Sequence, residues 1–238
     1  MPIRPKHLLL LIGGVLWLCI SCTRKRDLSQ NILLVHLLAE PKGLHPTNDN
    51  NAYQRMIFQC TQKRLLGFDL EQNKMVPELL AECPQLLADS TSLRCRLRDD
   101  IRWDDGSRVS VEDVAFTLKV IVCPLIKNPD QKGYFENFRS LVPDPMHKNG
   151  FIVLNRNRYY DFESMLSQVY LLQKKYWDPN GVMDKVGFAQ MLQEGFKAED
   201  WPGIQAFAEE FNSARNGREP GRLKGLGPYQ VSEWQTGA

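Results

Sequence analysis

The sequence lacks the short motifs that mark several common enzyme classes. It contains no G-x-S-x-G, no H-E-x-x-H and no phosphate-binding loop, so nothing in it indicates a serine hydrolase, a zinc protease or a P-loop nucleotidase. It also has no internal repeat and no low-complexity segment. These absences favour an ordinary globular protein whose function must be sought elsewhere in the chain.

An excess of charge of either sign is also missing. The 30 basic and 28 acidic residues give a formal charge of +2. Two of the basic residues, Arg4 and Lys6, lie in a leader-like N-terminus, and removing them leaves 28 of each sign. Because phosphate binding needs a basic surface, we expect no nucleic-acid partner. The composition instead favours a protein that binds small molecules or peptides.

The apolar run near the N-terminus is too short to span a bilayer comfortably. It covers residues 8–20, whereas a membrane helix needs roughly 20 apolar residues. Behind Arg4 and Lys6 it is typical of an export signal. The end of the run, Leu18-Cys19-Ile20-Ser21-Cys22, resembles a bacterial lipobox, which predicts a signal peptide over 1–21 and lipidation of Cys22. An uncleaved anchor, or a redox or metal site at the C-x-x-C spacing of Cys19 and Cys22, are the alternatives.

The four cysteines of the mature part, Cys60, Cys83, Cys95 and Cys123, leave two possibilities open. An exported protein meets oxidising conditions, so two disulfides in any of three pairings are possible. Buried free thiols are an equally good interpretation. The spacing of these cysteines fits no metal site, and we expect neither a metal nor a cofactor.

The stretch from Leu97 to Leu118 has the strongest local signals. Asp104, Asp105 and Gly106 predict a turn, since the carboxylates can accept nearby backbone N–H groups and glycine tolerates positive φ. Ser110 predicts a helix start, with Asp113 as its reciprocal cap. Apolar residues at helical spacing predict one buried face, formed by Val111, Val114, Ala115, Leu118, Ile121 and Val122.

Elsewhere the periodicity predicts further strands and helices. Strands are expected over Ile32–Leu38, Ser92–Leu97 and Phe151–Leu154. Helices are expected over Asn51–Gln62, with Tyr53, Met56, Ile57 and Cys60 on one stripe, over Tyr159–Trp177 and over Gly203–Asn212, with a possible short helix in the loop from Lys127 to Phe138. His36 is expected to be a hydrogen-bonded core histidine, and His45 a solvent-facing turn histidine with ligand contact as the alternative.

Three segments resemble one family of receptors. The stretch LRDDIRWDDGSRVSVEDVAFTL, from Leu97 to Leu118, resembles the signature of the family 5 extracellular solute-binding proteins, the oligopeptide- and dipeptide-binding components of ABC importers. The segment Glu40–Pro46 resembles the one that follows their first strand, although His45 replaces the usual Asp. Gly225–Tyr229 resembles their G-x-G-P-Y turn, which enters a strand. The resemblance extends from about Val35 to Trp234, and it also implies a strand over Leu65–Asp69.

The resemblance implies a mixed α/β fold with lobe I of a periplasmic-binding-protein-like clamshell and the family's small extra domain. It implies the following division: signal peptide 1–21, tether 22–31, first part of lobe I 32–50, small second domain 51–145, and return to lobe I 146–238. Family members continue into a second lobe, so we expect a truncated chain that carries one wall of the ligand crevice.

The function implied is that of a lipid-anchored, exported substrate-binding protein for peptides or similar small solutes, with an ABC permease as partner. The resemblance assigns Glu40, Pro41 and Tyr229 to the ligand-facing side of lobe I. Two alternatives remain. One is an interaction module on a surface lipoprotein. The other is an exported hydrolase that uses Asp104 and Asp105, or Glu112 and Asp113, although adjacent carboxylates in a turn or cap normally point apart. We therefore expect no enzyme.

Overall fold

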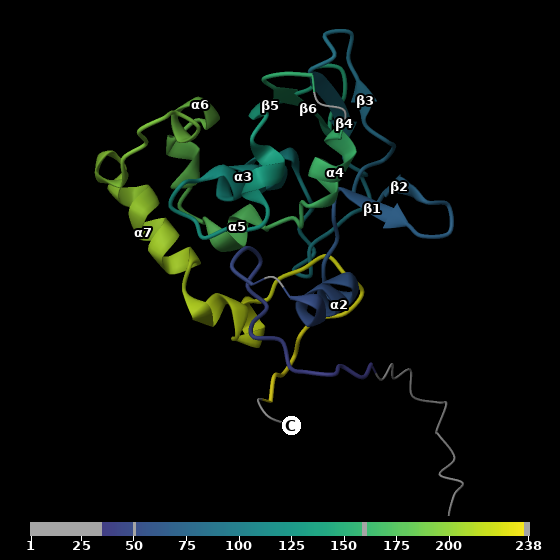
Figure 1. Ribbon diagram of the computed structural model, residues 1–238, viewed down its shortest axis with the longest axis vertical. Coiled ribbons are helices and arrows are strands. Elements are labelled where there is room, and N and C mark those ends of the chain that lie inside the picture. The colour runs from purple at the N-terminus through teal and green to yellow at the C-terminus, as the bar shows by residue number, and fades with distance from the viewer. Residues whose placement is uncertain (1–34, 50, 159–160, 236–238) are drawn as a thin grey trace, which may run out of the picture. The chain divides into compact units, whose positions relative to one another are not determined.

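The computed structural model describes residues 35–49, 51–158 and 161–235. The chain divides into two compact units, Met1–Leu38 and Ala39–Ala238, and the elements below belong to the second (Figure 1). Its helices are α2 Ala52–Thr61, α3 Val111–Val122, α4 Phe162–Ser167, α5 Lys174–Trp177, α6 Phe188–Met191 and α7 Pro202–Phe211. Its strands are β1 Leu66–Asp69, β2 Lys74–Pro77, β3 Gln85–Leu86, β4 Ser92–Arg96, β5 Phe138–Pro143 and β6 Gly150–Asn155. Short 3-10 helices are η1 Lys132–Phe135, η2 Met183–Lys185, η3 Ala198–Asp200, η4 Ala214–Gly217 and η5 Pro220–Arg222.

The strands form two antiparallel sheets. One is the β1–β2 hairpin, and the other has the order β3-β4-β6-β5. In the larger sheet Leu93 pairs with Val153, which pairs with Leu141, and all three are buried. The next row, Arg94 with Ile152, is only partly covered. This alternation is what an antiparallel sheet with one core-facing side requires, and it confirms the strands expected over Ser92–Leu97 and Phe151–Leu154.

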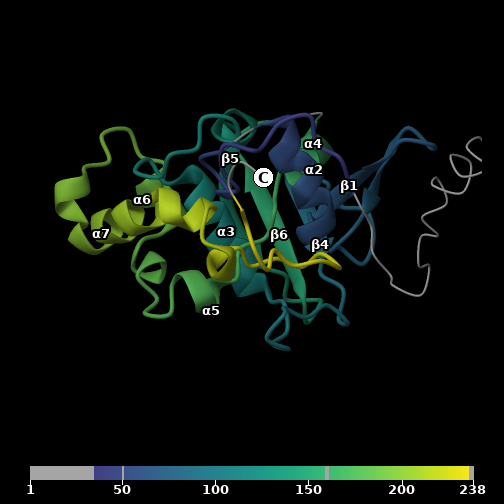
Figure 2. The ribbon, with the colours of Figure 1, turned by 90° about the horizontal axis from the view of Figure 1, so that it is seen from below.

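Helix α3 lies in the core and contacts α5, α6, η1 and η2 (Figure 2). The helix has the expected capping box, in which the Ser110 side chain accepts the Asp113 N–H and the Asp113 carboxylate accepts the Ser110 N–H. The expectation of a single buried face is too narrow, because Phe116, Thr117 and Val120 are also buried. A helix that is covered on nearly every side belongs to the interior of a domain rather than to its surface.

The acidic turn before α3 is as expected. Gly106 has φ of +78° and its N–H donates to the Trp103 carbonyl at 2.9 Å. Asp105 accepts the Ser107 N–H at 2.9 Å, which is the local bond that favours aspartate in turns. The strand ahead of the turn is shorter than expected. After β4 its pairing continues only as isolated bridges, Leu80 with Leu97 and Arg102 with Arg108.

Two strand expectations are not met in the described residues. Of the strand expected over Ile32–Leu38, residues 32–34 lie outside the described part of the chain, and residues 35–38 are not in a strand. Residues 225–231 form bends and extended backbone, again without a strand. An apolar or extended segment becomes a strand only where another strand pairs with it, and periodicity carries no information about that partner.

Two helix expectations need correction. The helix expected over Asn51–Gln62 is present as α2, but its buried residues are Gln54, Phe58 and Thr61 rather than the predicted apolar stripe, and Met56 is 42% exposed. The helix expected over Tyr159–Trp177 is two short helices, α4 and α5, joined by extended residues. Residues 159–160 lie outside the described part. Tyr170 forms a bridge with Arg64 at the break, so pairing with a distant segment interrupts the helix.

The remaining expectations concern domains and thiols. The boundaries expected at residues 50 and 145 stay predictions. The larger sheet takes β5 and β6 from opposite sides of the second boundary, so no break in the sheet occurs there. Cys60, Cys83, Cys95 and Cys123 are all free thiols, which decides against the two disulfides. Within the described ranges no helix combines the length and hydropathy needed to cross a bilayer.

Candidate functional site

The three residues predicted to face a ligand are Glu40, Pro41 and Tyr229. They lie in the 39–49 loop and in the C-terminal segment. Glu40 is exposed, and its carboxylate accepts the indole N–H of Trp234 at 2.5 Å. Pro41 is buried. Tyr229 is 50% exposed and its N–H donates to the Cys60 carbonyl at 3.2 Å, at the end of α2. The structure thus ties the 39–49 loop and the C-terminal segment to the same region, but none of the three lines the cavities described below.

His45 is buried, not solvent-facing, and it fixes the 39–49 loop. Only 2% of the residue is exposed. Its Nε2–H donates to the Phe211 carbonyl at 2.6 Å, while Nδ1 accepts the N–H groups of Thr47 and Asn48 at 3.2 and 3.1 Å. Burial lowers the pKa of His45, although the bond to Phe211 and the charge of Asp49 oppose this. The neutral imidazole therefore links the loop to the end of α7.

Two glycines allow Asp49 to close this loop. The Asp49 carboxylate accepts the His45 N–H at 2.7 Å. A Cβ on Gly43 would lie 2.1 Å from Asp49 Oδ2, and one on Gly217 would lie 2.5 Å from the His45 nitrogen. Gly217 also accepts the N–H of Leu44 at 2.8 Å. The loop therefore packs directly on η4, and its far side is left to line a cavity.

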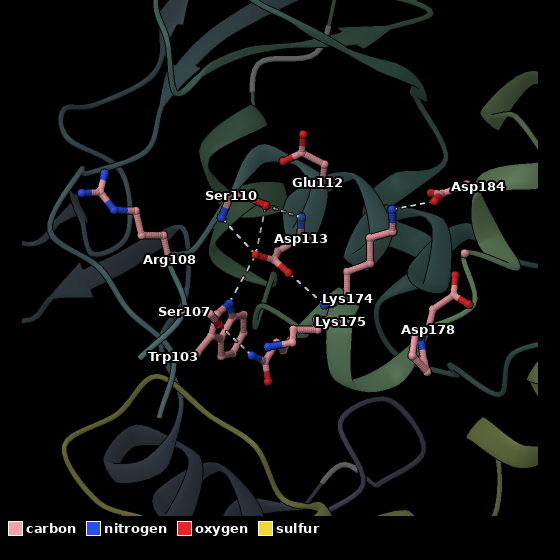
Figure 3. Close-up of a pocket in the computed structure, with 13 residues that line it drawn as sticks. Trp103, Ser107, Arg108, Ser110, Glu112, Asp113, Lys174, Lys175, Asp178 and Asp184 are labelled. Atoms are coloured by element: carbon pink, nitrogen blue, oxygen red, sulfur yellow. Dashed lines mark hydrogen bonds and ion pairs between the residues drawn. The ribbon is translucent and has the colours of Figure 1, made fainter. Parts of the chain in front are cut away.

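A cavity of about 450 Å³ at the start of α3 is lined by one of the two carboxylate pairs of the hydrolase alternative, Glu112 and Asp113 (Figure 3). Asp113 has no free oxygen there. Its Oδ2 accepts the Ser110 N–H at 3.0 Å and the Trp103 indole N–H at 3.3 Å, and its Oδ1 accepts the Lys174 N–H at 2.8 Å. Figure 3 shows the Glu112 side chain directed away from Asp113. Glu112 and Asp113 therefore do not form a pair of carboxylates that flanks a substrate.

Three other charged groups of this cavity, Lys174, Asp178 and Asp184, are also engaged. Lys174 Nζ donates to Asp184 at 2.6 Å (Figure 3). Both carboxylate oxygens of Asp178 accept backbone N–H groups, from Val182 at 2.7 Å and Met183 at 2.8 Å. Polar groups that satisfy one another hold elements together and leave little for a ligand. We interpret this cavity as the joint between α3, α5 and η2.

A smaller cavity of about 260 Å³ has a different character, and we name it the polar cavity. It lies between the 39–49 loop, α2, the loop that precedes η1, and the crossing of Arg64 with Tyr170. Its lining residues are Pro46, Thr47, Asp49, Gln54, Arg55, Phe58, Arg64, Asp130, Gln131, Tyr134, Gln168 and Tyr170. The described residues therefore bring two arginines, two aspartates, two tyrosines and three glutamines to one place, from three segments far apart in the sequence, 46–64, 130–134 and 168–170.

The Arg64–Tyr170 crossing forms one wall of the polar cavity. The Arg64 guanidinium lies 5.1 Å from the centre of the Tyr170 ring, and its Nη1 donates to the Ser167 carbonyl at 3.3 Å. Phe58 packs edge-on against the same ring, with centroids 5.2 Å apart. Burial raises the pKa of Tyr170, and the charge of Arg64 opposes the rise. The hydroxyl therefore stays protonated near neutral pH and can donate or accept a hydrogen bond.

The glutamines are held by backbone groups on either side of the cavity. Gln54 Nε2 donates to the His45 carbonyl at 2.8 Å, and Gln131 Nε2 donates to the Gln168 carbonyl at 2.9 Å. Fixed amides together with charges of both signs can pair with the amides and the charged ends of a peptide or of another small zwitterion. At about 260 Å³ the cavity is slightly smaller than most ligand pockets, so it would hold part of such a solute.

Sequence reasoning missed the polar cavity. Arg64 precedes a predicted strand and Tyr170 lies in a predicted helix, so neither position carries a periodic or motif signal. Gln54 on α2 gives no sequence signal either, because it lies outside the apolar stripe that was expected to be buried, and only the structure shows its burial. Among the residues that the structure describes, no group of three or more His, Cys, Asp or Glu side chains could hold a metal ion.

Solved structures support the fold. The chain is similar to the oligopeptide-binding protein AppA of Bacillus subtilis in complex with a nonapeptide, with 16% identity and a TM-score of 0.61, covering 84% of this chain and 34% of AppA. It is similar to the oligopeptide-binding protein of Thermus thermophilus complexed with a pentapeptide, with 19% identity, a TM-score of 0.58 and coverage of 82% and 33%. NikZ of Campylobacter jejuni in complex with Ni(L-His) gives 20% identity, a TM-score of 0.55 and coverage of 83% and 32%.

At these identities the similarity shows the fold alone, and the chain spans about a third of the length of each of these proteins. No curated protein sequence matches the chain. The model of the family described as bacterial extracellular solute-binding proteins, family 5 Middle, matches residues 74–238, which is more than half of the chain. The chain therefore belongs to the family 5 bacterial extracellular solute-binding proteins.

Proposed function

We propose that this chain is the solute-binding component of an ABC importer for peptides or similar small polar solutes. The polar cavity is the observation that carries the proposal, because it combines two guanidinium groups, two carboxylates and fixed amides without a catalytic arrangement. Binding is non-covalent: the ends and amides of the solute exchange their hydrogen bonds with water for bonds with these side chains. AppA and the Thermus protein, which bind peptides, support this solute class.

The proposal is tested by calorimetry on the full chain, with a mixed tripeptide library as ligand. Arg55→Gln and Asp130→Asn each remove one charge from the polar cavity. Each should weaken binding by about tenfold or more, as expected for a lost hydrogen bond to a charged group. Arg139→Gln is the control, since Arg139 is exposed and does not line the cavity. Equal binding by all four proteins would reject the polar cavity as the site.

The assignment of Glu40, Pro41 and Tyr229 as ligand contacts is a separate part of the proposal. Tyr229→Ala should weaken binding of the same library by about threefold or more, because an aromatic side chain contributes large contact area. Phe68→Ala is a matched control, since Phe68 is 48% exposed on β1 and Tyr229 is 50% exposed. If both variants bind as the unchanged chain does, Tyr229 is not a ligand contact.

We further propose that Cys22 carries a lipid that anchors the exported chain to a bacterial membrane, where it serves an ABC permease. The support is the lipobox-like sequence before Cys22. Cys22→Ser should abolish incorporation of labelled palmitate and move the chain to the soluble fraction, whereas Cys19→Ser should retain the label. Label that persists in Cys22→Ser would reject the anchor. Binding of no peptide by a lipidated chain would favour the interaction-module alternative instead.

A further inference from the structure

A second unassigned cavity lies where the end of α5, the second half of α7 and the η4–η5 segment meet. We name it the aromatic cavity. Its volume is about 400 Å³, within the range of pockets that bind small ligands. Its lining residues are Tyr176, Trp177, Phe207, Glu210, Phe211, Asn216 and Arg222. The joint around Asp113 described above shares none of these residues.

Four aromatic rings form most of the wall. Trp177 lies 4.9 Å from Phe211 and 5.2 Å from Tyr176, measured between ring centroids. Phe207 and Phe211 are stacked at 5.7 Å with an interplanar angle of 22°. Phe211 is only 1% exposed, so it holds this arrangement from the core side. Such a wall offers both ring faces and ring edges, which suits another flat ring.

The indole N–H of Trp177 needs an acceptor. Its nitrogen is buried, and within the described part of the chain it has no hydrogen-bond partner. A buried donor without an acceptor is unfavourable by the desolvation of the group, and tryptophan normally finds a partner when buried. A ligand that brings an oxygen to this N–H would remove that penalty. The ligand should therefore combine a ring with a carbonyl or hydroxyl oxygen.

The charged groups at the cavity argue against a cationic ligand. The Arg222 guanidinium donates from Nη1 to Asn216 at 2.9 Å and to Glu210 at 3.2 Å. Glu210 is also bonded to Arg215, so its carboxylate is already neutralised by two arginines. Arg222 also donates to the Glu219 carboxylate at 2.7 Å, so the charges at this wall are paired with one another. A four-ring cage can bind quaternary ammonium groups, but here neither Glu210 nor Glu219 is left unpaired to attract a cation. A neutral aromatic group fits better.

The aromatic cavity and the polar cavity each share lining residues with one small void. This void has a volume of about 10 Å³. It shares Pro46, Phe58 and Tyr170 with the polar cavity, and Trp177, Asn216 and Arg222 with the aromatic cavity. Two recognition surfaces of different chemistry therefore adjoin, as expected for a polar site with a pocket for one side chain.

We propose that the aromatic cavity is a subsite for an aromatic side chain of the solute, with a solute oxygen accepting the Trp177 indole N–H. This inference rests on the proposed function, since it assumes that the solute is a peptide. The aromatic cavity gives the receptor a preference for solutes with an aromatic side chain, which the polar cavity alone does not supply. Solutes with a phenylalanine or tyrosine side chain bind more tightly than their alanine counterparts.

The test compares four probes on the full chain: N-acetyl-L-phenylalanine amide, N-acetyl-L-alanine amide, Ala-Phe-Ala and Ala-Ala-Ala. Binding is measured by calorimetry, and the Trp177 indole N–H is followed by nitrogen-15 NMR, with Trp177→Phe identifying its signal. Trp177→Phe keeps an aromatic ring but removes the donor. Trp201→Phe is the matched control, because Trp201 stacks on Phe196 outside the cavity.

The phenylalanine amide should bind and shift the Trp177 signal, whereas the alanine amide should do neither. Trp177→Phe should weaken binding of the phenylalanine amide by about three- to tenfold, as expected for one hydrogen bond, and Trp201→Phe should leave it unchanged. Equal binding of Ala-Phe-Ala and Ala-Ala-Ala without a shift at Trp177 would overturn the subsite and leave the proposed function standing. Binding of the amide at Trp177 without binding of either tripeptide would support the aromatic site and overturn the peptide function.

Discussion

His45 illustrates how one side chain can determine the position of a loop, here the 39–49 loop. Its two ring nitrogens make bonds of opposite kinds: Nε2 donates to Phe211 and Nδ1 accepts from Thr47 and Asn48. Two groups pack against the imidazole. One is the Phe211 ring, edge-on with its centroid 5.1 Å from that of His45, and the other is the 45–49 loop with the Asp49 carboxylate. Protonation of Nδ1 would replace an acceptor with a donor opposite two N–H groups.

We therefore expect the protein to lose stability in mild acid. Burial lowers the pKa of His45 below its ordinary value of 6.5. Below pH 6.5 the unfolded chain binds a proton that the folded chain resists, so the free energy of unfolding should fall as the pH falls and stay level above that window. Urea unfolding between pH 5 and pH 8 measures this.

The control for the acid effect is a histidine on the surface. In His45→Gln the acid-dependent part of the free energy of unfolding should largely disappear, since glutamine does not titrate. In His147→Gln it should persist, because His147 is exposed and its ring is hydrogen-bonded to Asp144 within the β5–β6 turn. An unchanged pH profile in His45→Gln would show that other groups cause the acid sensitivity.

At the scale of elements, the Asp113 carboxylate at the start of α3 links this helix to Trp103 and Lys174. Ser110→Ala removes one cap and should lower the free energy of unfolding by about 1 kcal/mol. Asp113→Ala removes the acceptor of the Ser110, Trp103 and Lys174 N–H groups. This should have a larger effect, about 3 kcal/mol or more, because buried donors lose a charged acceptor.

Glu112→Ala is the control for these α3 variants. Glu112 lies in the same helical turn but is exposed, so its loss should change the free energy of unfolding by less than about 1 kcal/mol, the usual effect of a charge near a helix end. All three variants are compared by denaturant unfolding at pH 7. If the free energy of unfolding falls no further in Asp113→Ala than in Ser110→Ala, Asp113 does not link α3 to its neighbours.

The second element-scale prediction concerns the packing of the G-x-G-P-Y segment on α2. The Gly227 N–H donates to the Thr61 carbonyl at 3.0 Å, and a Cβ at Gly227 would lie 2.3 Å from the Cys60 carbonyl oxygen. Backbone cannot move aside cheaply, so Gly227→Ala should lower the free energy of unfolding by about 1–3 kcal/mol. It should also expose residues 226–235 to protease.

Gly221→Ala provides the comparison, because a Cβ there would meet no atom within 4 Å. Its free energy of unfolding and its protease pattern should match those of the unchanged chain. The contrast tests whether close approach to α2, rather than any loss of flexibility, explains the glycine. Equal behaviour of the two variants would mean that the C-terminal segment is not packed on α2 in solution.

For the whole molecule, the free thiols report which parts of the chain are covered. Cys83 is exposed, whereas Cys95 and Cys123 are buried, and burial raises the pKa of both buried thiols. In the folded protein Cys83 should be alkylated quickly, and Cys95 and Cys123 only after unfolding, because the thiolate is the reactive form. Mass mapping of alkylated peptides distinguishes each site. Resistance of any of the four to alkylation after unfolding, relieved by reductant, would indicate a disulfide.

The local sequence was sufficient for the features that arise within a few residues. The Asp-Gly turn, the Ser110 cap, α2, α7 and the strand around Phe151 form where they were predicted. Each depends on a short-range interaction or a simple periodicity. Strand β5 was missed, since the register of β5 on β6 contains an irregularity between Phe138 and Ser140 that blurs the alternation.

The sequence by itself determined the family of this protein, because the order of an arginine segment, an Asp-Gly turn and a capped helix is written in consecutive residues. It also determined the helix start and the turn, whose bonds join residues two to four positions apart. Tertiary structure alone decided the burial of His45, the break between α4 and α5 and both cavities. Each of these depends on contacts between segments that lie tens of residues apart or more, such as Arg64 with Tyr170, and local patterning carries no record of such partners.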